Sequence, residues 1–463
     1  MPFTYHQPTR TECTICEKLH TADRGEPIID TSNGKASSAN NFPFHNWYNF
    51  VLGYSPEFPR FMLEREQINP TDLVVDPFMG SGTTLICCKL LGIPSKGIDA
   101  NDFMADAART KLRWDVDTRR LGKVRDEVLK EVEYEYSTFR WAGEAPQQRT
   151  LFDVFEEEQQ PYLPYVQSRR PAMLLPKYLS DKPFARASII KDVIQRKLVN
   201  DPMRTYFDLA LDSIIVPISN IRYGPGFGVV APRDDVDVLG LFAIKLQRMI
   251  RDLESVNAEQ RAVPAEVALG DARCLSTYVE PNSTALILTS PPYPGDHEYT
   301  KHTRLELIFR GYARNMDEFK IIKRRMLRAS TTNLYNDDHE RESISDLESV
   351  QAVTSLIHER LVHDGATSGF EKLYTKLVWE YFGGMYRVLQ ESWTTLNPGG
   401  KVALLVSDSH AFKMVHLQTA KILQEIGERV GFVCPEVVLW QFKVSTSHTY
   451  NLRENILLLT KPF

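Results

Sequence analysis

The stretch from Leu73 to Thr84, Leu-Val-Val-Asp-Pro-Phe-Met-Gly-Ser-Gly-Thr-Thr, constrains the fold of this 463-residue chain more than any other. Its first residues, Leu73–Val75, form a short apolar run with two β-branched members, which predicts a buried strand. Gly80 and Gly82 allow the backbone to turn tightly and to approach a ligand closely, and a helix is expected from Leu85 to Leu91. A strand, a glycine turn and a helix N-terminus form a nucleotide-type site at the carboxyl edge of an open α/β sheet. The alternative is a purely structural turn.

The segment after this helix, Ile93–Asn101, favours the ligand-binding interpretation. It predicts a second short strand that ends in Asp99, about 20 residues after the glycine turn, where an acidic side chain can accept hydrogen bonds from ribose hydroxyls. No Gly-Lys-Ser/Thr follows the turn, which argues against a phosphate-binding P-loop, and the spacing G-x-G-x-x-G of a dinucleotide site is absent. The pattern therefore favours a nucleoside ligand without a pyrophosphate.

Further apolar runs extend the predicted sheet. A third strand is expected from Ala265, ending at Gly270-Asp271, and a fourth, Ala285–Thr289, leads directly into Ser290-Pro-Pro-Tyr293. Three more runs complete a set of seven strands: Val402–Val406, Val437–Trp440 and Asn455–Thr460. The last two are expected to form an antiparallel hairpin, and no role is assigned to Arg453 and Glu454 between them. These runs predict an α/β fold with a mostly parallel sheet.

Two of these motifs together resemble a known family. Asp-Pro-Phe-x-Gly-Ser-Gly-Thr-Thr, from Asp76 onwards, and Ser290-Pro-Pro-Tyr293 look like motifs of the S-adenosylmethionine-dependent DNA methyltransferases that modify exocyclic amino groups, producing N4-methylcytosine or N6-methyladenine. The resemblance covers roughly residues 42–112, 265–300 and 370–460. It implies a Rossmann-like class I methyltransferase fold with helical insertions, S-adenosyl-L-methionine as cofactor and double-stranded DNA as substrate.

The resemblance also implies which residues contact the cofactor. The positions that match are Asp76, Phe78, Gly80, Gly82, Thr83, Asp99 and Asp271. In that family the acidic residue at the position of Asp271 accepts a hydrogen bond from the adenine amino group of the cofactor. The segment before the glycine turn packs over the methionine end, which makes His45, Trp47 and Tyr54 candidates for that wall. Packing of aromatic side chains in the core is the alternative.

The chemistry of Ser290-Pro-Pro-Tyr293 follows from the poor nucleophilicity of an exocyclic amino nitrogen. Acceptors such as Ser290 Oγ and the Pro291 carbonyl can hold its hydrogens and free its lone pair. The paired prolines Pro291 and Pro292 make the turn rigid, and Tyr293 can stack on a base flipped out of the duplex. Catalysis is then mainly positioning for an in-line displacement. His297 is a candidate base for the released proton, or a surface histidine.

Other features exclude or limit related chemistry. A cytosine-C5 methyltransferase would need a Pro-Cys dipeptide after a strand, whereas Cys434-Pro435 has the reverse order. The net charge of −5, from 55 basic and 60 acidic residues, is not the signature of a general nucleic-acid binder, so any DNA contact must be local.

A basic helix is expected to contact phosphates through Lys320, Lys323, Arg324 and Arg328, a solvated helix face being the alternative. Arg222, in the glycine-rich loop 219–228, is a second candidate DNA contact, or part of an ordinary turn cluster.

The expected organisation has four parts. Residues 1–40 form a polar arm with no expected metal, in which Cys13 and Cys16 are free thiols, and a zinc site with nearby histidines is the alternative. Residues 41–113 form the cofactor-binding part. Residues 114–264 form a helical insert with an expected role in target recognition. Its helices are expected at Leu121–Tyr134, Pro202–Ile214 and Asp234–Asn257, with a connector at Pro161–Arg170. Residues 265–463 form the catalytic part, with a basic helical insertion near 300–367.

The sequence thus predicts a site-specific DNA methyltransferase of a restriction-modification or related defence system. In the resembled family, Ser at position 290 goes more often with cytosine N4 than with adenine N6, so cytosine N4 is preferred. The alternatives are an N6-adenine enzyme, an RNA guanine-N2 methyltransferase and a regulatory subunit that recognises DNA without methylating it. A cognate restriction endonuclease is a possible partner. The absence of a transmembrane run, together with only six cysteines, predicts a cytoplasmic location.

Overall fold

The computed structural model of the chain describes residues 42–141, 160–223, 227–295, 297–364, 369–444 and 451–463. The predicted polar arm at residues 1–40 lies outside this part of the chain. The same holds for Cys13 and Cys16, which were expected to be free thiols, with a zinc site as the alternative.

The core of the molecule is a seven-stranded sheet with the order β10-β11-β9-β8-β1-β2-β7. Five strands of this sheet, β1, β2, β7, β8 and β9, pair in parallel. Strand β11 runs antiparallel to both β9 and β10. The strands span Val74–Asp76 (β1), Ser95–Asp99 (β2), Ala265–Leu269 (β7), Thr284–Thr289 (β8), Leu396–Ser407 (β9), Val433–Val444 (β10) and Asn451–Thr460 (β11). The prediction of seven mostly parallel strands is confirmed, although β11 begins early enough to include Arg453 and Glu454.

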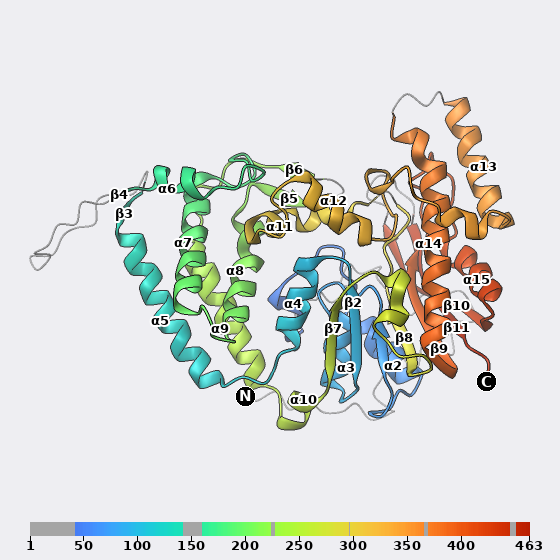
Figure 1. Cartoon of the computed structure of the whole chain (residues 1–463), viewed down its shortest axis with the longest axis horizontal. Coiled ribbons are helices and arrows are strands. Elements are labelled where there is room, and N and C mark those ends of the chain that lie inside the picture. The colour runs from blue at the N-terminus through green and yellow to red at the C-terminus, as the bar shows by residue number, and fades with distance from the viewer. Residues whose placement is uncertain (1–41, 142–159, 224–226, 296, 365–368, 445–450) are drawn as a thin grey trace, which may run out of the picture.

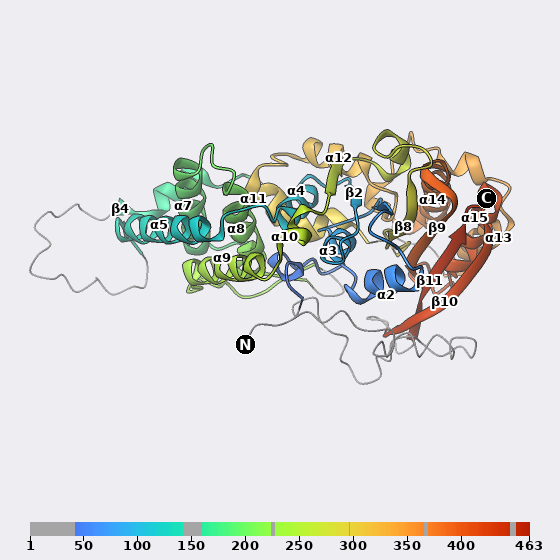
Figure 2. The same cartoon turned by 90° about the horizontal axis from the view of Figure 1, so that it is seen from below.

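Helices cover both faces of this sheet, as a parallel sheet requires (Figure 1). Alternate strand residues point to opposite faces. Val74, Leu286 and Leu405 pack in one apolar cluster with Phe58 of α2, whereas Val75 packs in a second cluster with α14 and α15. Figure 2 shows α2 and α3 on one side of the strands and α14 on the other. These helices span Glu57–Arg65 (α2), Thr83–Leu90 (α3), Tyr374–Thr395 (α14) and Thr419–Val430 (α15).

A group of helices follows α4 (Asp102–Leu112) and precedes β7 in the chain. In Figure 1 most of these helices form a bundle beside the edge of the sheet that ends in β7, and the last and shortest of them lies apart at the bottom of the view. They span Thr118–Ser137 (α5), Tyr162–Arg169 (α6), Asp181–Lys197 (α7), Arg204–Ile218 (α8), Val238–Glu254 (α9) and Ala258–Ala262 (α10). The three helices expected here are confirmed as α5, α8 and α9. Two short strands, β3 (Phe139–Arg140) and β4 (Gln160–Pro161), pair at the end of α5.

Two local predictions in this region were wrong. The Pro-rich segment Pro161–Arg170 was expected to be a connector, but most of it is helix α6. Pro164 lies in the first turn of α6, where backbone N–H groups have no intrahelical acceptor, so proline is tolerated. The glycine-rich loop 219–228 contains a two-stranded hairpin, β5 (Ile221–Tyr223) and β6 (Phe227–Val229).

The sheet order creates a switch point beside β1. The chain passes from β1 to β2 and β7 in one direction, then returns to β8 on the opposite side of β1. The carboxyl ends of β1 and β8 therefore lie side by side, and in open α/β sheets ligands bind at such a point. Helices α11 (Arg304–Arg310) and α12 (Met316–Arg325) lie over this edge at the top of Figure 1. Helix α13 (Glu348–His363) lies beyond α14.

The turn after β1 requires a glycine at position 82, and this requirement can be tested. Gly82 precedes α3 with a φ of +88°, and a Cβ there would lie 3.2 Å from the Ala108 Cβ of α4. Gly92, just after the same helix, has a φ of +81° but open space around the Cβ position. A left-handed conformation costs a non-glycine residue about 1–2 kcal/mol. Gly92→Ala is expected to lose only this conformational free energy, whereas Gly82→Ala also brings a Cβ close to Ala108. Gly82→Ala is expected to lower the thermal unfolding midpoint by several degrees more, and equal midpoints in the two variants would contradict this.

Candidate active site

A cleft of about 980 Å³ opens at the switch point. It is lined by the turn after β1, the end of β2 and the segment after β8, which contribute Gly80, Asp99 and Ser290. Further wall comes from the segment 50–54 and from residues between Arg325, at the end of α12, and Asn333. The cleft thus brings together residues from the carboxyl ends of three parallel strands, where ligands bind in open α/β sheets.

Asp76 lies behind the glycine turn rather than in the cleft. Its carboxylate is fully buried and accepts hydrogen bonds from the Thr289 hydroxyl at 2.5 Å, the Tyr54 hydroxyl at 2.7 Å and the Phe78 backbone N–H at 3.0 Å. Burial raises the pKa of this carboxyl group. Since Thr289 immediately precedes Ser290, Asp76 ties the turn after β1 to the end of β8. The other predicted cofactor residues of this turn, Phe78, Gly80 and Thr83, line the cleft, whereas Gly82 lies at the start of α3.

Asp99 borders the cleft at the end of β2. Its two carboxylate oxygens accept hydrogen bonds from the Gly80 N–H at 2.9 Å and the Asn101 N–H at 2.8 Å. Burial raises the pKa of Asp99 to about 7. These two bonds hold the carboxylate in place, and each oxygen keeps a second lone pair for a hydroxyl of a ligand.

Asp271 is engaged by a neighbour instead of facing the cleft. The Arg273 guanidinium donates to both carboxylate oxygens, at 3.0 Å to Oδ1 and 2.7 Å to Oδ2, and also pairs with Glu340. Ala272, the next residue, lines the cleft. An adenine amino group could use Asp271 only by displacing Arg273 or by sharing a carboxylate oxygen with it.

The Ser-Pro-Pro-Tyr segment places Ser290 and Pro292 on the cleft wall. Ser290 Oγ donates a hydrogen bond to the Leu405 carbonyl at 3.1 Å and lies 3.2 Å from Tyr293 Oη. Tyr293 in turn donates to Glu454 Oε1 of β11 at 2.8 Å. Sequence reasoning assigned no role to Glu454, and the only available signal was an acidic residue next to the apolar run Ile456–Leu459.

The aromatic segment before β1 contributes only in part to the cleft. Tyr54 lines it, together with Phe50 and Leu52, as predicted for this segment. Trp47 is fully buried, donates its indole N–H to Asp252 of α9 at 2.7 Å and does not line the cleft. His45 is buried near Cys87. Placing Trp47 and His45 in the wall was therefore wrong, because both pack in the core.

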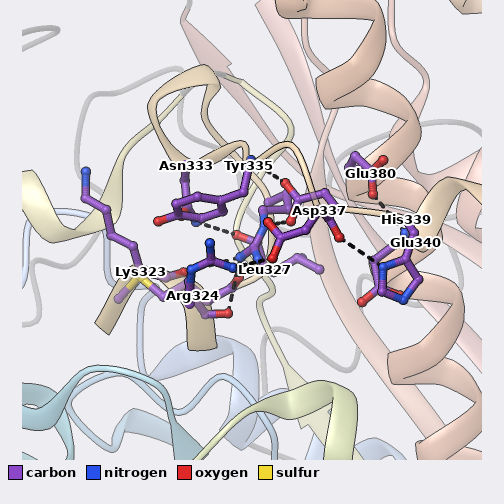
Figure 3. Close-up of polar contacts among 12 residues, drawn as sticks. Lys323, Arg324, Leu327, Asn333, Tyr335, Asp337, His339, Glu340 and Glu380 are labelled. Atoms are coloured by element: carbon purple, nitrogen blue, oxygen red, sulfur yellow. Dashed lines mark hydrogen bonds and ion pairs between the residues drawn. The ribbon is translucent and has the colours of Figure 1, made fainter. Parts of the chain in front are cut away.

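The basic cluster after residue 319 is largely paired with acids. Lys320 pairs with Asp317 and Lys323 with Glu298, at 2.8 Å and 3.1 Å. Arg324 pairs with Asp337 at 2.9 Å, and Figure 3 shows its guanidinium beside the Tyr335 ring, 4.2 Å from the ring centroid.

Arg328 does not extend that helix face, contrary to expectation. Helix α12 ends at Arg325, because Met326 has an extended backbone with a φ of −82° and a ψ of 149°. The Arg328 side chain is only 5% exposed and pairs with Asp338 at 2.9 Å. A buried, paired guanidinium cannot contact a DNA phosphate, so the prediction for Arg328 was wrong. Tyr335 N also donates to Asp338, which holds this segment against α12.

Two cleft residues were missed by sequence reasoning. Arg325 lines the cleft and pairs with Asp102 at the start of α4. Asn333 also lines it, is 4% exposed, and its Oδ1 has no hydrogen-bond partner among the described residues. A buried acceptor without a partner is costly, so a ligand that donates a hydrogen bond here would satisfy it. Gly80 adds open space, since no atom lies within 4 Å of the position of a Cβ.

One histidine lines the cleft, and two more follow the end of β9. His297 is exposed and lines the cleft, where it remains a candidate base. At the end of β9, His416 Nε2 lies 3.0 Å from Asp408 Oδ2, and the rings of His410 and His416 stack with their centroids 4.6 Å apart.

Among the helices of the described ranges, none combines the length and the hydropathy that a membrane span needs.

One part of this chain is similar to known proteins. Residues 33–110 match the family model for DNA methylases of N6 and N4 type. The type II methyltransferase M.BsoBI of Geobacillus stearothermophilus is 42% identical over 59 residues, which is 13% of this chain and 12% of that protein. The type II methyltransferase M.MjaII of Methanocaldococcus jannaschii is 38% identical over 85 residues, 18% of this chain and 16% of that protein. The matches thus span a small share of either relative.

Proposed function

We propose that this chain, which belongs by its residues 33–110 to the DNA amino-methyltransferases of N4/N6 type, transfers a methyl group to an exocyclic amino nitrogen of a base in double-stranded DNA. S-adenosyl-L-methionine is the expected cofactor of this family. The observation that carries the proposal is the shared cleft. It brings Asp99, a carboxylate suited to ribose hydroxyls, and Ser290, an acceptor for an amino group, together at the switch point of the sheet.

The residues of the cleft fit this cofactor. Asp99 offers free lone pairs at the end of β2, where ribose hydroxyls bind in nucleoside sites. Asn333 Oδ1 is a buried acceptor that has no partner within the described part of the chain and could accept from a donating group, and the open space above Gly80 among these residues admits a close ligand. When bound, S-adenosyl-L-methionine supplies a methyl group on a positively charged sulfur.

The chain's own residues then prepare the nucleophile. Ser290 Oγ and the Pro291 carbonyl accept the two hydrogens of the amino group, which draws its nitrogen toward sp³ geometry and frees the lone pair. The two prolines hold this turn rigid, and Tyr293 offers an aromatic face to a flipped base. Because the transfer needs no covalent intermediate, the rate comes mainly from positioning in a site shielded from water.

Cytosine N4 is the proposed target atom. Serine at position 290 goes more often with cytosine N4 than with adenine N6 in the resembled family, and adenine N6 is the alternative. The proposal includes a cytoplasmic protein of a restriction-modification system with a cognate endonuclease, since both matched relatives are named type II methyltransferases.

The β5–β6 hairpin is the proposed start of the DNA-recognition surface. It leans on the segment that follows Ser-Pro-Pro-Tyr, because the Tyr223 hydroxyl donates to the Lys301 carbonyl at 3.3 Å and the Tyr223 ring lies 5.1 Å from the His302 ring. Arg222 and Lys301 are exposed beside this contact. Exposed basic side chains of the helical insert (Arg222) and of the catalytic part (Lys301) thus lie close together. The exposed part of Arg324 can extend this basic surface.

Replacement of Arg222 tests this surface. Arg222→Ala is expected to raise the dissociation constant for duplex DNA about three- to tenfold at low salt and to reduce the slope of log K against log salt by about 1, because one phosphate contact is lost. Fluorescence anisotropy at several salt concentrations measures both. Arg119→Ala, which removes an exposed arginine of α5, is the matched control. Equal salt slopes in all three proteins would place the DNA elsewhere.

The proposed function is tested by methyl transfer from labelled S-adenosyl-L-methionine to duplex DNA, followed by digestion to nucleosides and mass analysis. We expect N4-methylcytosine. N6-methyladenine would keep the chemistry and correct the base, and label in RNA alone would assign the chain to RNA guanine-N2 or other RNA base methylation. Cofactor binding without any transfer would indicate a regulatory subunit that recognises DNA.

A further inference from the structure

A buried carboxylate lies behind the Ser-Pro-Pro-Tyr segment. Glu454 of β11 is 1% exposed, although β11 is separated from β8 by β9 in the sheet. Glu454 Oε1 accepts the hydroxyl of Tyr293 at 2.8 Å and also pairs with Lys443 of β10. Glu454 Oε2 accepts the side-chain amide of Gln441. An acid this deeply buried, with partners on β10 and on the segment after β8, connects the proposed site to the opposite edge of the sheet.

Glu454 determines the direction of the hydrogen bonds in front of it. An ionised carboxylate only accepts, so Tyr293 must donate its single proton to Glu454. Burial and the Glu454 charge raise the pKa of Tyr293, which keeps that proton in place. Tyr293 Oη therefore has only lone pairs left for Ser290, 3.2 Å away.

Ser290 is consequently oriented as an acceptor toward the cleft. Its hydroxyl has one proton, and its two hydrogen-bonding neighbours among the described residues, Tyr293 Oη and the Leu405 carbonyl, both accept. The Ser290 proton points to one of these two oxygens, away from the cleft. A lone pair of Ser290 Oγ remains free for an amino hydrogen of the base.

We propose that Glu454 is a positioning residue that orients Ser290 through Tyr293 and receives, along the same hydrogen bonds, the proton released after methyl transfer. The inference rests on the proposed function. The methylated, positively charged amino group gives one proton to Ser290 Oγ, the Ser290 proton moves to Tyr293 Oη, and the Tyr293 proton moves to Glu454 Oε1. Each hydroxyl oxygen loses one O–H bond and gains another, so both hydroxyls are restored and the carboxylate becomes neutral.

The surroundings of Glu454 allow the proton to leave. Lys443 is 45% exposed and pairs with Glu454, and its ammonium group lies 5.3 Å from the centre of the Tyr293 ring. The carboxylate is thus in direct contact with a group that reaches water. Once Glu454 is neutral, its attraction to Lys443 weakens, and water at this rim can remove the proton before the next turnover.

The test compares Glu454→Gln with the unmodified chain in single-turnover methyl transfer over a range of pH. Glutamine keeps the shape of the side chain but cannot take up a proton. We expect the rate constant to fall about 10²-fold, as for loss of a general base, while the dissociation constants for S-adenosyl-L-methionine and DNA change by less than about threefold. The part of the pH–rate profile that reports the proton acceptor is expected to disappear.

Two further variants keep the test decisive. Tyr293→Phe removes only the hydroxyl in the middle of the path, and it is expected to match Glu454→Gln in rate and pH profile, with no further loss in the double variant. It also replaces Glu454→Gln if that variant does not fold. Glu436→Gln, an exposed glutamate of β10 that pairs with Arg65, is the matched control and is expected to behave like the unmodified chain.

The outcomes separate this inference from the proposed function. If the unmodified chain transfers methyl groups and both Glu454→Gln and Tyr293→Phe keep its rate and pH profile, Glu454 has no such role and the function stands. If the variants lose rate but keep the pH profile, Glu454 only supports the fold of the segment, and the inference is overturned. If the unmodified chain transfers no methyl group to any nucleic acid, the function and the inference fall together.

Discussion

Replacement of Ser290 by alanine is expected to slow methyl transfer about 10²–10³-fold while the affinity for S-adenosyl-L-methionine stays within about threefold. This is the range found when one preorganised hydrogen-bonding group is removed from a transition state. Ser290 lines the cleft at the end of β8, and its hydroxyl is directed by Tyr293 and the Leu405 carbonyl. Without it, only the Pro291 carbonyl remains to hold the amino hydrogens.

The measurement is the single-turnover rate of methyl transfer to duplex DNA, with cofactor affinity measured by calorimetry on the same preparations. Ser409→Ala is the matched control, since Ser409 lies just beyond β9, is buried and does not line the cleft. A Ser290→Ala protein with an unchanged rate would remove Ser290 from the chemistry. A protein that no longer binds the cofactor would show that Ser290 supports the cleft itself.

Replacement of Asp99 by asparagine is expected to weaken S-adenosyl-L-methionine binding about 10- to 100-fold. Hydrogen bonds to a charged group contribute about 1.5–3 kcal/mol, and the carboxylate is held for this purpose by the Gly80 and Asn101 N–H groups. Asparagine keeps one acceptor and presents an amide N–H₂ to the other donor. Calorimetric titration with the cofactor measures the loss, and Asp126→Asn, an exposed aspartate of α5, is the control.

The same carboxylate makes cofactor binding depend on pH. The pKa of Asp99 in the free protein is about 7 because of burial, and the carboxylate rather than the acid accepts the ribose hydroxyls. As the pH falls below about 7, the ionised fraction falls, so the affinity is expected to decrease by up to about tenfold per pH unit until the lower pKa of the complex is reached. The Asp99→Asn variant is expected to lose this dependence. An affinity independent of pH between about 5.5 and 8.5 in the unmodified protein would contradict the assignment.

Much of the architecture was available from local sequence patterns. Apolar runs of strand length, the glycine turn at Gly80 and Gly82 and the position of Asp99 each act over a few residues, so a linear reading identified them. The structure confirms all seven strands and their mostly parallel arrangement. The connector predicted at Pro161–Arg170 is mostly helix α6. Proline favoured a connector because it breaks a helix in the interior, but Pro164 lies in the first turn, where proline is tolerated.

The charged and buried partners depended on tertiary contacts. Arg328 looked like a phosphate contact, but Asp338 and the end of α12 at Arg325 bury it. Asp271 matched a cofactor position, yet Arg273 engages it.

The sequence by itself therefore determined the sheet, the glycine turn and the chemistry-bearing segments, because the geometry of a strand or turn depends on residues that are neighbours in the chain. Only the tertiary structure decided which acids and bases are free to meet a ligand, because the direction of each side chain and the packing of the segments decide which charges pair, whether the partners are two residues apart, as Asp271 and Arg273 are, or far apart in the chain. Glu454, 161 residues from Tyr293, is the clearest case: its meaning appears only when β11 folds back against the segment after β8.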